Sequence, residues 1–520
     1  MGVIASTIRG WLIKMGIIQE LNSVLDYRSF PISNEFFQKI EMWKAIYSGY
    51  YPKWHRVKYH TVDGSYRERD METMGMAKVV AQEMASLIFN ERCSISVSDQ
   101  NFNELVEDVF EQNKFFSKFQ DYLEFMFGLG GMVIKPYVED GKIKFSYVTA
   151  DCFIPISWNN EGIFEGAFQF QTHKGNKYYT HLEIHLRKPE VNGYLIKNEL
   201  FESDMPGKLG VKVDLSILYP DLEPEVVIKN LERPLFVYFK PNIANNIDMT
   251  SPLGIPLYAN ALSTLKSLDI AFDSFQREFR LGKKRILVPA TAIRAVPDEN
   301  GNLVRYFDAS DEVYQAYATA NLQDQKIYDN SVELRVEEHI AAINALLNIL
   351  AIQVGFSAGT FTFDGQGVKT ATEVVSENSK TFKSKQSHEI IVEQGITDLI
   401  ACVKVLADLY ELFPTPDDYK VTVYFDDSIA EDQNAEIDKQ VKLVINRLTS
   451  RKRAIMKIHG LTEEEAELLL QEIMEEEKLN INLDIMDAIP MEGSTVNNIK
   501  PQVGGEEPEE PELDGEDTEE

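Results

Sequence analysis

The stretch that organises this chain runs from Ser331 to Leu412, and residues 336–367 within it read VEEHIAAINALLNILAIQVGFSAGTFTFDGQG. Apolar residues recur there in alternating steps of four and three, which places them in one stripe along a helix. We expect that stripe to pack against a second helix. The residues of the stripe are Val336, Ile340, Ile343, Leu347, Leu350 and Val354.

A glycine-rich break follows this helix. Residues 355–367 contain four glycines and a Phe-Thr-Phe sequence without any periodicity, which predicts a mobile loop. The chain restarts at Thr370, because Thr370 and Glu373 form a capping box at the start of another long helix. We expect this helix to be polar in its first half and buried in its second half. The polar half carries Lys380, Lys383 and Lys385, and the apolar half runs from Ile391 to Tyr410.

Composition defines the broad class of protein. The chain has 520 residues, of which 44% are hydrophobic and 26% charged, and this balance predicts a globular protein with two or more cores. Its net charge of -31 argues against tight or sequence-reading binding of duplex DNA. The same charge is compatible with a surface along which DNA slides. The three cysteines are far apart, which predicts no disulfide framework, and we find no apolar run long enough to span a bilayer.

The first half of the chain predicts an α+β fold. An amphipathic arm is followed by helical patterns at about residues 34–50, 72–90 and 102–127, and an aromatic and basic cluster lies between the first two. From Met132 to about Phe239, glycine and asparagine turns separate short alternating runs, which is typical of an antiparallel meander. We expect residues 208–225 to be a surface insertion in this meander.

One strand of the meander carries a candidate metal site. Residues 180–187 alternate strictly, which places His181, Glu183 and His185 on the same face. Two imidazoles and a carboxylate are possible metal ligands. However, neighbours at i and i+2 on a strand stand about 7 Å apart, and an exposed polar face explains the three residues without a metal.

A second long helix is predicted over residues 251–282. Ser251 supplies an N-cap and Pro252 the first helical position, while Gly282 closes the helix. Its apolar side consists of Tyr258, Leu262, Leu265, Phe272, Phe275 and Phe279.

Residues 283–330 separate the two long helices and predict a small module. The expected parts are a strand at residues 285–289, a turn at Asn300-Gly301 and a strand at residues 304–307. Basic residues gather where the first helix ends, so contact with phosphate or an acidic partner is one interpretation. Favourable charges at a helix C-terminus are the other. These residues are Arg277, Arg280, Lys283, Lys284 and Arg285.

The last part of the chain predicts one more strand and two short helices. The strand covers residues 417–425, and the helices cover about residues 450–458 and 462–478. From Met491 onward the sequence is polar and acidic, which predicts disorder.

Several enzyme signatures are missing from the sequence. The segment Gly367-Val-Lys-Thr370 lacks both the glycine-lysine pair and the upstream glycine of a phosphate-binding loop. No zinc-protease or serine-hydrolase motif occurs either. We therefore expect a protein that is not an enzyme.

The order of these parts resembles that of tailed-bacteriophage portal proteins, in particular the portal or minor capsid family of siphophages of Gram-positive hosts. The most specific sequences are Gly367-Val-Lys-Thr-Ala-Thr-Glu-Val374 and Phe425-Asp-Asp-Ser-Ile-Ala-Glu-Asp432, with Ala435-Glu436 and Ser450-Arg-Lys after them.

This resemblance implies a portal architecture: a mixed α/β wing, a two-helix stem, a small α/β clip and a helical crown. The implied parts are an N-terminal arm (1–33), the wing (34–250), the first stem helix (251–282), the clip (283–330), the second stem helix (331–354), the tunnel loop (355–369), a long helix that returns to the wing (370–445), the crown (446–490) and a disordered acidic tail (491–520).

The resemblance also implies a function. Portals form a ring, usually a dodecamer, at the unique capsid vertex, and double-stranded DNA is packaged and ejected through it. The implied partners are further copies of the chain, the terminase large subunit, head-tail adaptors and the major capsid or scaffolding protein. The implied locations are the virion and, during assembly, the host cytoplasm. No cofactor, metal or membrane is expected.

Two groups of site residues follow from the resemblance. The tunnel loop should face passing DNA without reading bases, and the clip should contact the motor or adaptor through Arg280, Lys283, Lys284 and Arg285. The tunnel-loop residues are Thr360, Phe361, Thr362, Phe363, Asp364, Gly365 and Gln366.

Two other classes of protein stay open from the sequence alone. A metal-dependent hydrolase would use His181, Glu183 and His185. A membrane-surface scaffold would use the amphipathic N-terminus.

Overall fold

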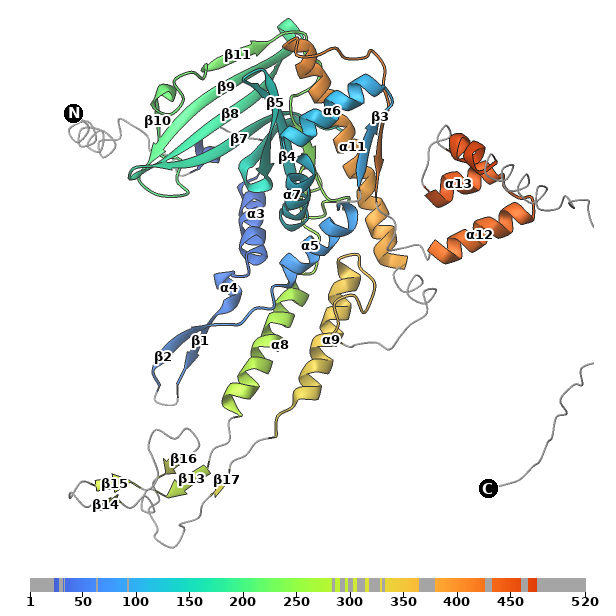
Figure 1. Cartoon of the computed structure of the whole chain (residues 1–520). Helices are drawn as coiled ribbons and strands as arrows, with labels where there is room; N and C mark the ends of the chain where they lie inside the picture. Colours follow the sequence, from blue (N-terminus) through green and yellow to red (C-terminus); the bar gives the residue numbers. More distant parts are fainter. Residues whose placement is uncertain are drawn as a thin grey trace, which may run out of the picture. The chain divides into compact units, whose positions relative to one another are not determined.

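The fold was analysed in a computed structural model of the chain (Figure 1), which divides into two compact units, residues 1–432 and residues 433–520. Helices and sheets are mixed in the first unit, so the predicted α+β class is confirmed. The structure describes residues 23–27, 31, 33–61, 64–90, 93–282, 286–289, 295–297, 303–305, 314–317, 328–329, 333–363, 379–425, 433–459 and 466–474.

Helices and a small sheet build the main core of the first unit. Large aromatic side chains such as Trp43, Phe115, Phe119 and Phe127 are fully buried there, and helices α3, α5, α7 and α11 contact one another or the sheet β12-β4-β5. The helices are α3 (Asn34–Tyr47), α5 (Met76–Ile88), α6 (Gln100–Gln112), α7 (Phe115–Leu129) and α11 (Ser379–Leu409), and the strands are β4 (Met132–Glu139), β5 (Lys142–Thr149) and β12 (Val237–Phe239).

One helix of the sequence prediction is in fact two. The expected helix at residues 102–127 breaks between α6 and α7, where Lys114 adopts a left-handed conformation with φ 51°. The Asn113 side chain donates to the Ile143 carbonyl and accepts from the Phe145 amide. The break therefore anchors the helices to β5, which helical periodicity alone does not reveal.

The predicted antiparallel meander is confirmed as a larger sheet in the order β10-β9-β8-β7-β6, with β11 also paired to β9. The expected insertion at residues 208–225 contributes to it, because β10 and the start of β11 lie in that segment. The strands are β6 (Phe153–Trp158), β7 (Ile163–Lys174), β8 (Lys177–Lys188), β9 (Gly193–Ser203), β10 (Val211–Val213) and β11 (Glu225–Ile228), and short helical turns occur at α2 (Val24–Tyr27), η1 (Ala150–Cys152), η2 (Pro189–Val191) and η3 (Leu215–Ile217).

Two long helices, α8 (Leu262–Leu281) and α9 (Val336–Gln353), pack side by side (Figure 1). The Glu278 carboxylate binds Arg335 near one end of the pair, and Thr264 donates to Gln353 at 2.8 Å near the other. The two helices are therefore antiparallel.

The predicted start of the first long helix at Ser251 was wrong, because α8 begins eleven residues later. Residues 251–261 instead form an irregular buried segment. The Leu257 amide donates to the Phe127 carbonyl, and the Tyr258 hydroxyl donates to the carbonyls of Trp43 and Gly128. Tertiary contacts with α3 and α7 thus override the apparent cap at Ser251.

The second long helix starts at the first residue of the predicted stripe. Ile343, Leu347, Leu350 and Val354 are buried, as expected. Val336 is only half-buried and Ile340 is 36% exposed, because they lie near the end of α9 that is farthest from the main core of the first unit.

A charged hairpin lies beside α8. Its strands β1 (Arg56–His60) and β2 (Tyr66–Asp70) follow the short helix α4 (Pro52–His55), in the segment where the sequence predicted an aromatic and basic cluster. Most of the hairpin residues are exposed. Arg69 binds both carboxylate oxygens of Asp273 on α8, which fixes the hairpin to that helix.

The segment between the long helices contains short strands, as the sequence predicted. The expected turn at Asn300-Gly301 lies between β14 (Ala295–Pro297) and β15 (Leu303–Arg305), which pair antiparallel. The other strands are β13 (Ile286–Pro289), β16 (Tyr314–Tyr317) and β17 (Tyr328–Asp329), with β13 between the other two.

Strand β18 (Val421–Tyr424) completes the first unit by pairing with β3 (Ser94–Val97), so the strand predicted at residues 417–425 is confirmed. The second unit contains α12 (Gln433–Ile445) and α13 (Arg451–His459), which contact each other, and a helical stretch at residues 466–474. The Lys452 ammonium binds Glu467 at 2.6 Å.

Candidate functional site

The segment after α9 folds back on the helix that precedes it. Gly355 adopts φ +92°, which ends α9, and the Phe356 side chain is fully buried. The Gly359 amide donates to Asn348 Oδ1 at 2.7 Å, and the Phe363 amide donates to Asn344 Oδ1 at 3.1 Å. Residues 355–363 form the predicted loop, without helix or strand, and side-chain hydrogen bonds join this part of it to α9.

A second anchor joins the same segment to α11. The Ser357 amide donates to Thr381 Oγ1 at 2.8 Å, and the Thr381 amide donates to Ser357 Oγ at 3.2 Å. Both side chains are buried. The segment thus links α9 to α11.

The predicted tunnel-loop residues do not share one environment. Phe361 is partly buried and contacts the Phe356 ring at a centroid distance of 5.1 Å, so it packs inward. Thr360 is exposed, Thr362 is half-buried, and Phe363 is 61% exposed. Asp364, Gly365 and Gln366 lie outside the described residues, as does the capping box at Thr370.

The first half of α11 is less polar than the sequence predicted. Lys385 is buried and binds the Glu389 carboxylate at 2.6 Å. Since i and i+4 residues share a helix face, this pair could have been recognised from its spacing, but its burial could not. The apolar second half is confirmed from Ile396 to Leu406, whereas Tyr410 is 53% exposed.

Three carboxylates of α8 hold the neighbouring elements. Asp269 accepts from the Thr73 hydroxyl and the Met74 amide and lies 3.1 Å from the buried His55 imidazole. Burial disfavours the Asp273 carboxylate, but hydrogen bonds from Arg69 and from the Glu72 amide outweigh this and hold its pKa below the usual value. Sequence periodicity predicted the apolar side of α8 but not the role of its carboxylates.

The third carboxylate, Glu278, joins α8 to α9. Its hydrogen bond from Arg335 lowers the pKa of Glu278 to about 2. Of the predicted clip contacts, Arg280 is exposed near the end of α8. Lys283, Lys284 and Arg285 lie outside the described residues.

The candidate metal residues form a buried ionic cluster with a lysine. Glu183 binds the Lys135 ammonium at 2.5 Å and the His185 imidazole at 2.6 Å, while His181 pairs with Asn198 at 3.0 Å. The expectation of an exposed polar face was wrong, since Lys135 of β4 binds Glu183. The rings of Phe236 and Tyr219 lie against His185 and His181. The lysine cation occupies the place where a metal would have to bind the carboxylate. Among the described residues, no group of three or more His, Cys, Asp or Glu side chains could hold a metal ion.

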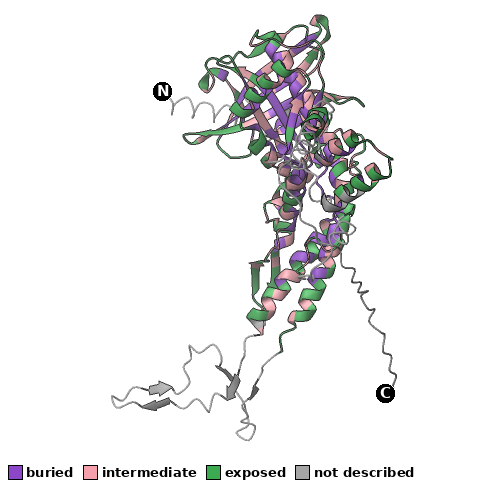
Figure 2. Cartoon of the chain, turned by 45° about the vertical axis from the view of Figure 1, so that its right-hand side comes forward, coloured by how far each residue is buried: buried purple, intermediate pink, exposed green. Residues whose placement is uncertain are grey.

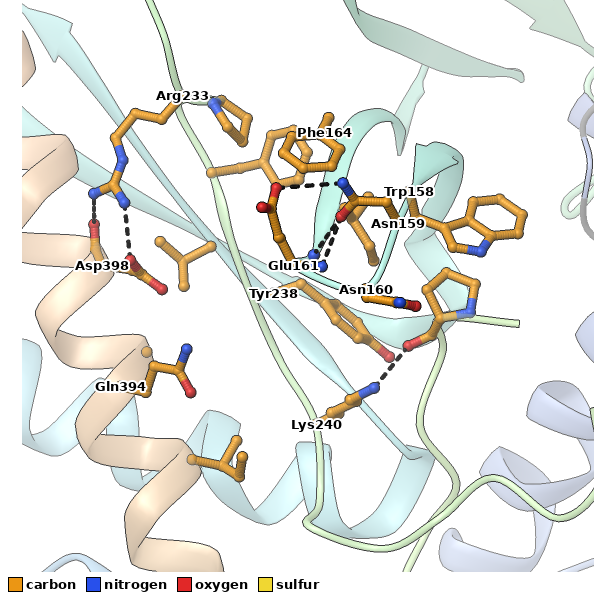
Figure 3. A pocket seen from close by; sticks show the side chains of 18 of the residues that line it. Trp158, Asn159, Asn160, Glu161, Phe164, Arg233, Tyr238, Lys240, Gln394 and Asp398 are labelled. Atoms are coloured by element: carbon orange, nitrogen blue, oxygen red, sulfur yellow. Dashed lines mark hydrogen bonds and ion pairs between the residues drawn. The ribbon is translucent and has the colours of Figure 1, made fainter. Parts of the chain in front are cut away.

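A cavity of about 940 Å³ lies between the β6–β7 turn, β12 and α11 (Figure 3). Arg233 is paired with Asp398 at 2.9 Å, and Lys240 donates to the Pro252 carbonyl. Burial raises the pKa of the Cys402 thiol to about 12. No histidine is among the described residues that line the cavity.

The second long helix has an apolar face that no described residue covers. Figure 2 shows exposed residues along the part of α8 and α9 that lies away from the main core of the first unit. Ala341, Ala345, Ile349 and Ile352 lie on the side of α9 opposite its buried stripe, and Ile349 and Ile352 are 47% and 52% exposed. A helix that is apolar all round is normally buried on every side.

An exposed apolar helix face of this kind is typical of a structural protein that contacts other chains. The chain belongs to the phage portal proteins of the SPP1 Gp6-like family, whose family model matches residues 28–479. This confirms the resemblance seen in the sequence: the protein is a tailed-phage portal protein.

Other comparisons add little to this assignment. No match was found among curated proteins. No described helix is both long and apolar enough to cross a bilayer. Neither a hydrolase nor a membrane-surface scaffold gains support from these findings.

Proposed function

We propose that copies of this chain form a closed ring, a dodecamer by the family resemblance, at the unique capsid vertex, and that double-stranded DNA enters and leaves the capsid through it. The observation that carries this proposal is the uncovered apolar face of α9. In a ring each copy contacts two neighbours through two different surfaces, so a helix pair with two free sides suits that symmetry.

The matching surface is the outer side of α8. Its exposed residues include Ser263, Ser267, Ile270 and Ser274, which are small or aliphatic. The contacts Glu278–Arg335 and Thr264–Gln353 place Ile270 at about the height of Ala345 and Ser267 at about the height of Ile349. Copies related by rotation about a ring axis meet at equal heights, so these residues of neighbouring copies would contact each other.

Charge supports the same pairing. The first turn of α9 carries Glu337 and Glu338, which are exposed, and the end of α8 at that height carries Arg277 and Arg280. Opposite charges on adjoining copies would favour this register and disfavour a shifted one.

The experiment changes the α9 face. The double variant Ala345→Glu/Ile349→Glu places two carboxylates at the interface and should convert the assembly to single chains, measured by mass photometry at matched concentration. Met205→Glu is the control, because Met205 is 55% exposed on a turn far from α9 in the sequence. If the double variant has the same mass as the wild type and the control, this interface is wrong.

The tunnel-loop proposal concerns residues 360–366. Phe363 is 61% exposed, and its aromatic ring offers contact with DNA without base recognition. Deletion of residues 360–366 should leave rings visible and reduce DNA packaging. Full packaging by the deleted protein would contradict this role.

The clip proposal concerns Arg280, Lys283, Lys284 and Arg285, which we propose contact the terminase large subunit or a head-tail adaptor. Their positive charge supports it, because the rest of the chain is strongly acidic. Charge reversal at Lys283, Lys284 and Arg285 should weaken the binding of one of these partners. Unchanged affinity for both partners would contradict the proposal that these basic residues contact them.

The remaining partners follow from the same function. A portal at the capsid vertex contacts the major capsid or scaffolding protein during assembly in the host cytoplasm and stays in the virion. The net charge of -31 supports a conduit that lets a polyanion pass without strong retention.

A further inference from the structure

The second unit contains a basic region that none of the assignments above uses. Between Lys439 and Thr462 the chain has seven lysines and arginines and no aspartate or glutamate, although the whole chain carries 83 acidic and 52 basic residues. The region covers the second half of α12, the corner after it and all of α13. A local excess of this size indicates an anionic partner.

Three arginines surround an open concavity at the corner between the two helices. The concavity has a volume of about 690 Å³, and Arg447, Arg451 and Arg453 line it together with the polar residues Thr449 and Ser450. All three arginines are exposed. Within the described part of the chain their side chains make no ion pair, in contrast to Lys452, which binds Glu467. An exposed guanidinium group can bind an anionic ligand through charge-assisted hydrogen bonds.

The positions of these arginines are unfavourable for the isolated fold. Arg447 adopts a left-handed conformation with φ 58°, which a residue with a side chain rarely adopts. Arg451 and Arg453 lie in the first turn of α13, where the helix dipole disfavours cations. Three like charges at one corner also repel one another. An anion in the concavity would relieve the repulsion.

We propose that the arginine corner, defined as Arg447, Arg451 and Arg453, binds the phosphate backbone of double-stranded DNA without reading its sequence. This inference rests on the proposed function, which supplies double-stranded DNA as the anionic ligand and an assembly that carries many copies of the arginine corner. Guanidinium groups bind phosphate oxygens in a bidentate manner, and the Thr449 and Ser450 hydroxyls are further donors. Repetition around a ring would add weak contacts into measurable affinity.

A second anion that could bind the arginine corner is the acidic C-terminal segment of the same chain. Residues 506–520 contain ten acidic residues and no basic one. We favour DNA as the ligand, because DNA is the polyanion that the proposed function brings to the assembled protein. The acidic segment is treated as a competitor in the test.

The experiment measures binding of a short fluorescent duplex to the assembled full-length protein by anisotropy, between about 50 and 200 mM salt. The variant Arg447→Gln/Arg451→Gln/Arg453→Gln should weaken binding by at least about tenfold at the low salt concentration. It should also flatten the salt dependence, because each phosphate that the protein neutralises adds about 0.9 to the slope of the logarithm of the binding constant against the logarithm of the salt concentration. A duplex of scrambled sequence should bind equally well.

The matched control is Lys53→Gln/Lys78→Gln/Lys118→Gln, which removes three exposed positive charges from the first unit. It should stay within about twofold of the wild type, because scattered surface charges contribute little to a local site. Equal affinities of the arginine variant and this control would overturn the proposal.

Truncation after Val503 separates the competitor from the ligand. If the acidic segment occupies the arginine corner, the truncated wild type should bind the duplex more tightly, and the truncated arginine variant should still bind poorly. If both truncated proteins bind equally, or neither binds, the proposal is overturned. Electron microscopy of each variant tests ring formation separately, so that loss of DNA binding with intact rings is distinguished from failure of the proposed ring.

Discussion

At the residue scale, the buried ion pair between Lys135 on β4 and Glu183 on β8 links the sheet β12-β4-β5 to the larger sheet β10-β9-β8-β7-β6. Alternation along the strand predicted which side chains share a face, and this was correct. It could not predict that the face is buried, because Lys135, which binds Glu183, comes from β4 of the sheet β12-β4-β5. The burial of a strand face depends on the packing of another element and not on the strand's own sequence.

We expect Glu183→Gln to destabilise the protein by about 3 to 5 kcal/mol, the usual effect of removing one partner of a buried ion pair. The variant leaves the Lys135 ammonium buried without its counter-ion. The free energy of unfolding in urea measures the loss.

The control for this change is Glu139→Gln, which breaks the exposed pair between Glu139 and Lys144 on β4 and β5. Surface pairs contribute little to stability, so the control should unfold near the wild-type midpoint. Equal effects of the two variants would mean that the Glu183 cluster adds nothing to the joining of the sheets.

His388 on α11 provides a prediction about pH. Its imidazole accepts from the Asn242 amide at 3.0 Å, and burial lowers the pKa of His388 to about 4, against about 6.5 in an unfolded chain. The unfolded state therefore binds the proton first. The stability that neutral His388 contributes is complete above pH 6.5 and is lost as the pH falls toward 4, by about 3 kcal/mol in all.

The variant His388→Gln tests this directly. It removes the titrating group but keeps a side-chain oxygen that can accept from Asn242. The unfolding free energy of the wild type should fall more steeply between pH 6.5 and pH 4 than that of the variant. Parallel curves for the two proteins would show that His388 does not titrate as described.

At the element scale, the segment after α9 shows what composition can and cannot predict. Four glycines and a lack of periodicity predicted a loop, which residues 355–363 form, but not the side-chain hydrogen bonds that join it to α9 and α11. Asn344 and Asn348 supply two of these bonds from the helix itself. Their spacing of four residues is visible in the sequence, but it did not indicate a partner so close in the chain.

We expect Asn344→Ala/Asn348→Ala to release this segment. Each lost hydrogen bond is worth about 1 kcal/mol, so the amides of Gly359 and Phe363 should exchange with solvent roughly fivefold faster. Hydrogen-deuterium exchange followed by mass spectrometry measures this. Asn446→Ala, which changes an asparagine of the second unit, should leave the exchange of these peptides unaltered, and an identical pattern in both variants would refute the anchoring role.

At the scale of the whole molecule, the order of helices, meander and inserted strands could be predicted, because each depends on periodicity and turn residues within one segment. The start of α8 could not, since Ser251-Pro252 has the composition of a helix cap while tertiary contacts with α3 and α7 hold residues 251–261 in another form. The sequence did not reveal the free face of α9, because the regular apolar stripe on the opposite side of the helix was a stronger signal than its alanines and isoleucines. An α9 helix that is apolar on both sides indicates a larger assembly.

Negative-stain electron microscopy of the purified wild-type protein tests the central claim most directly. The account predicts closed rings with a central hole, formed by copies whose α8 and α9 stand side by side around the axis. A preparation that contains only single compact particles, at concentrations where the protein is fully folded, would contradict it.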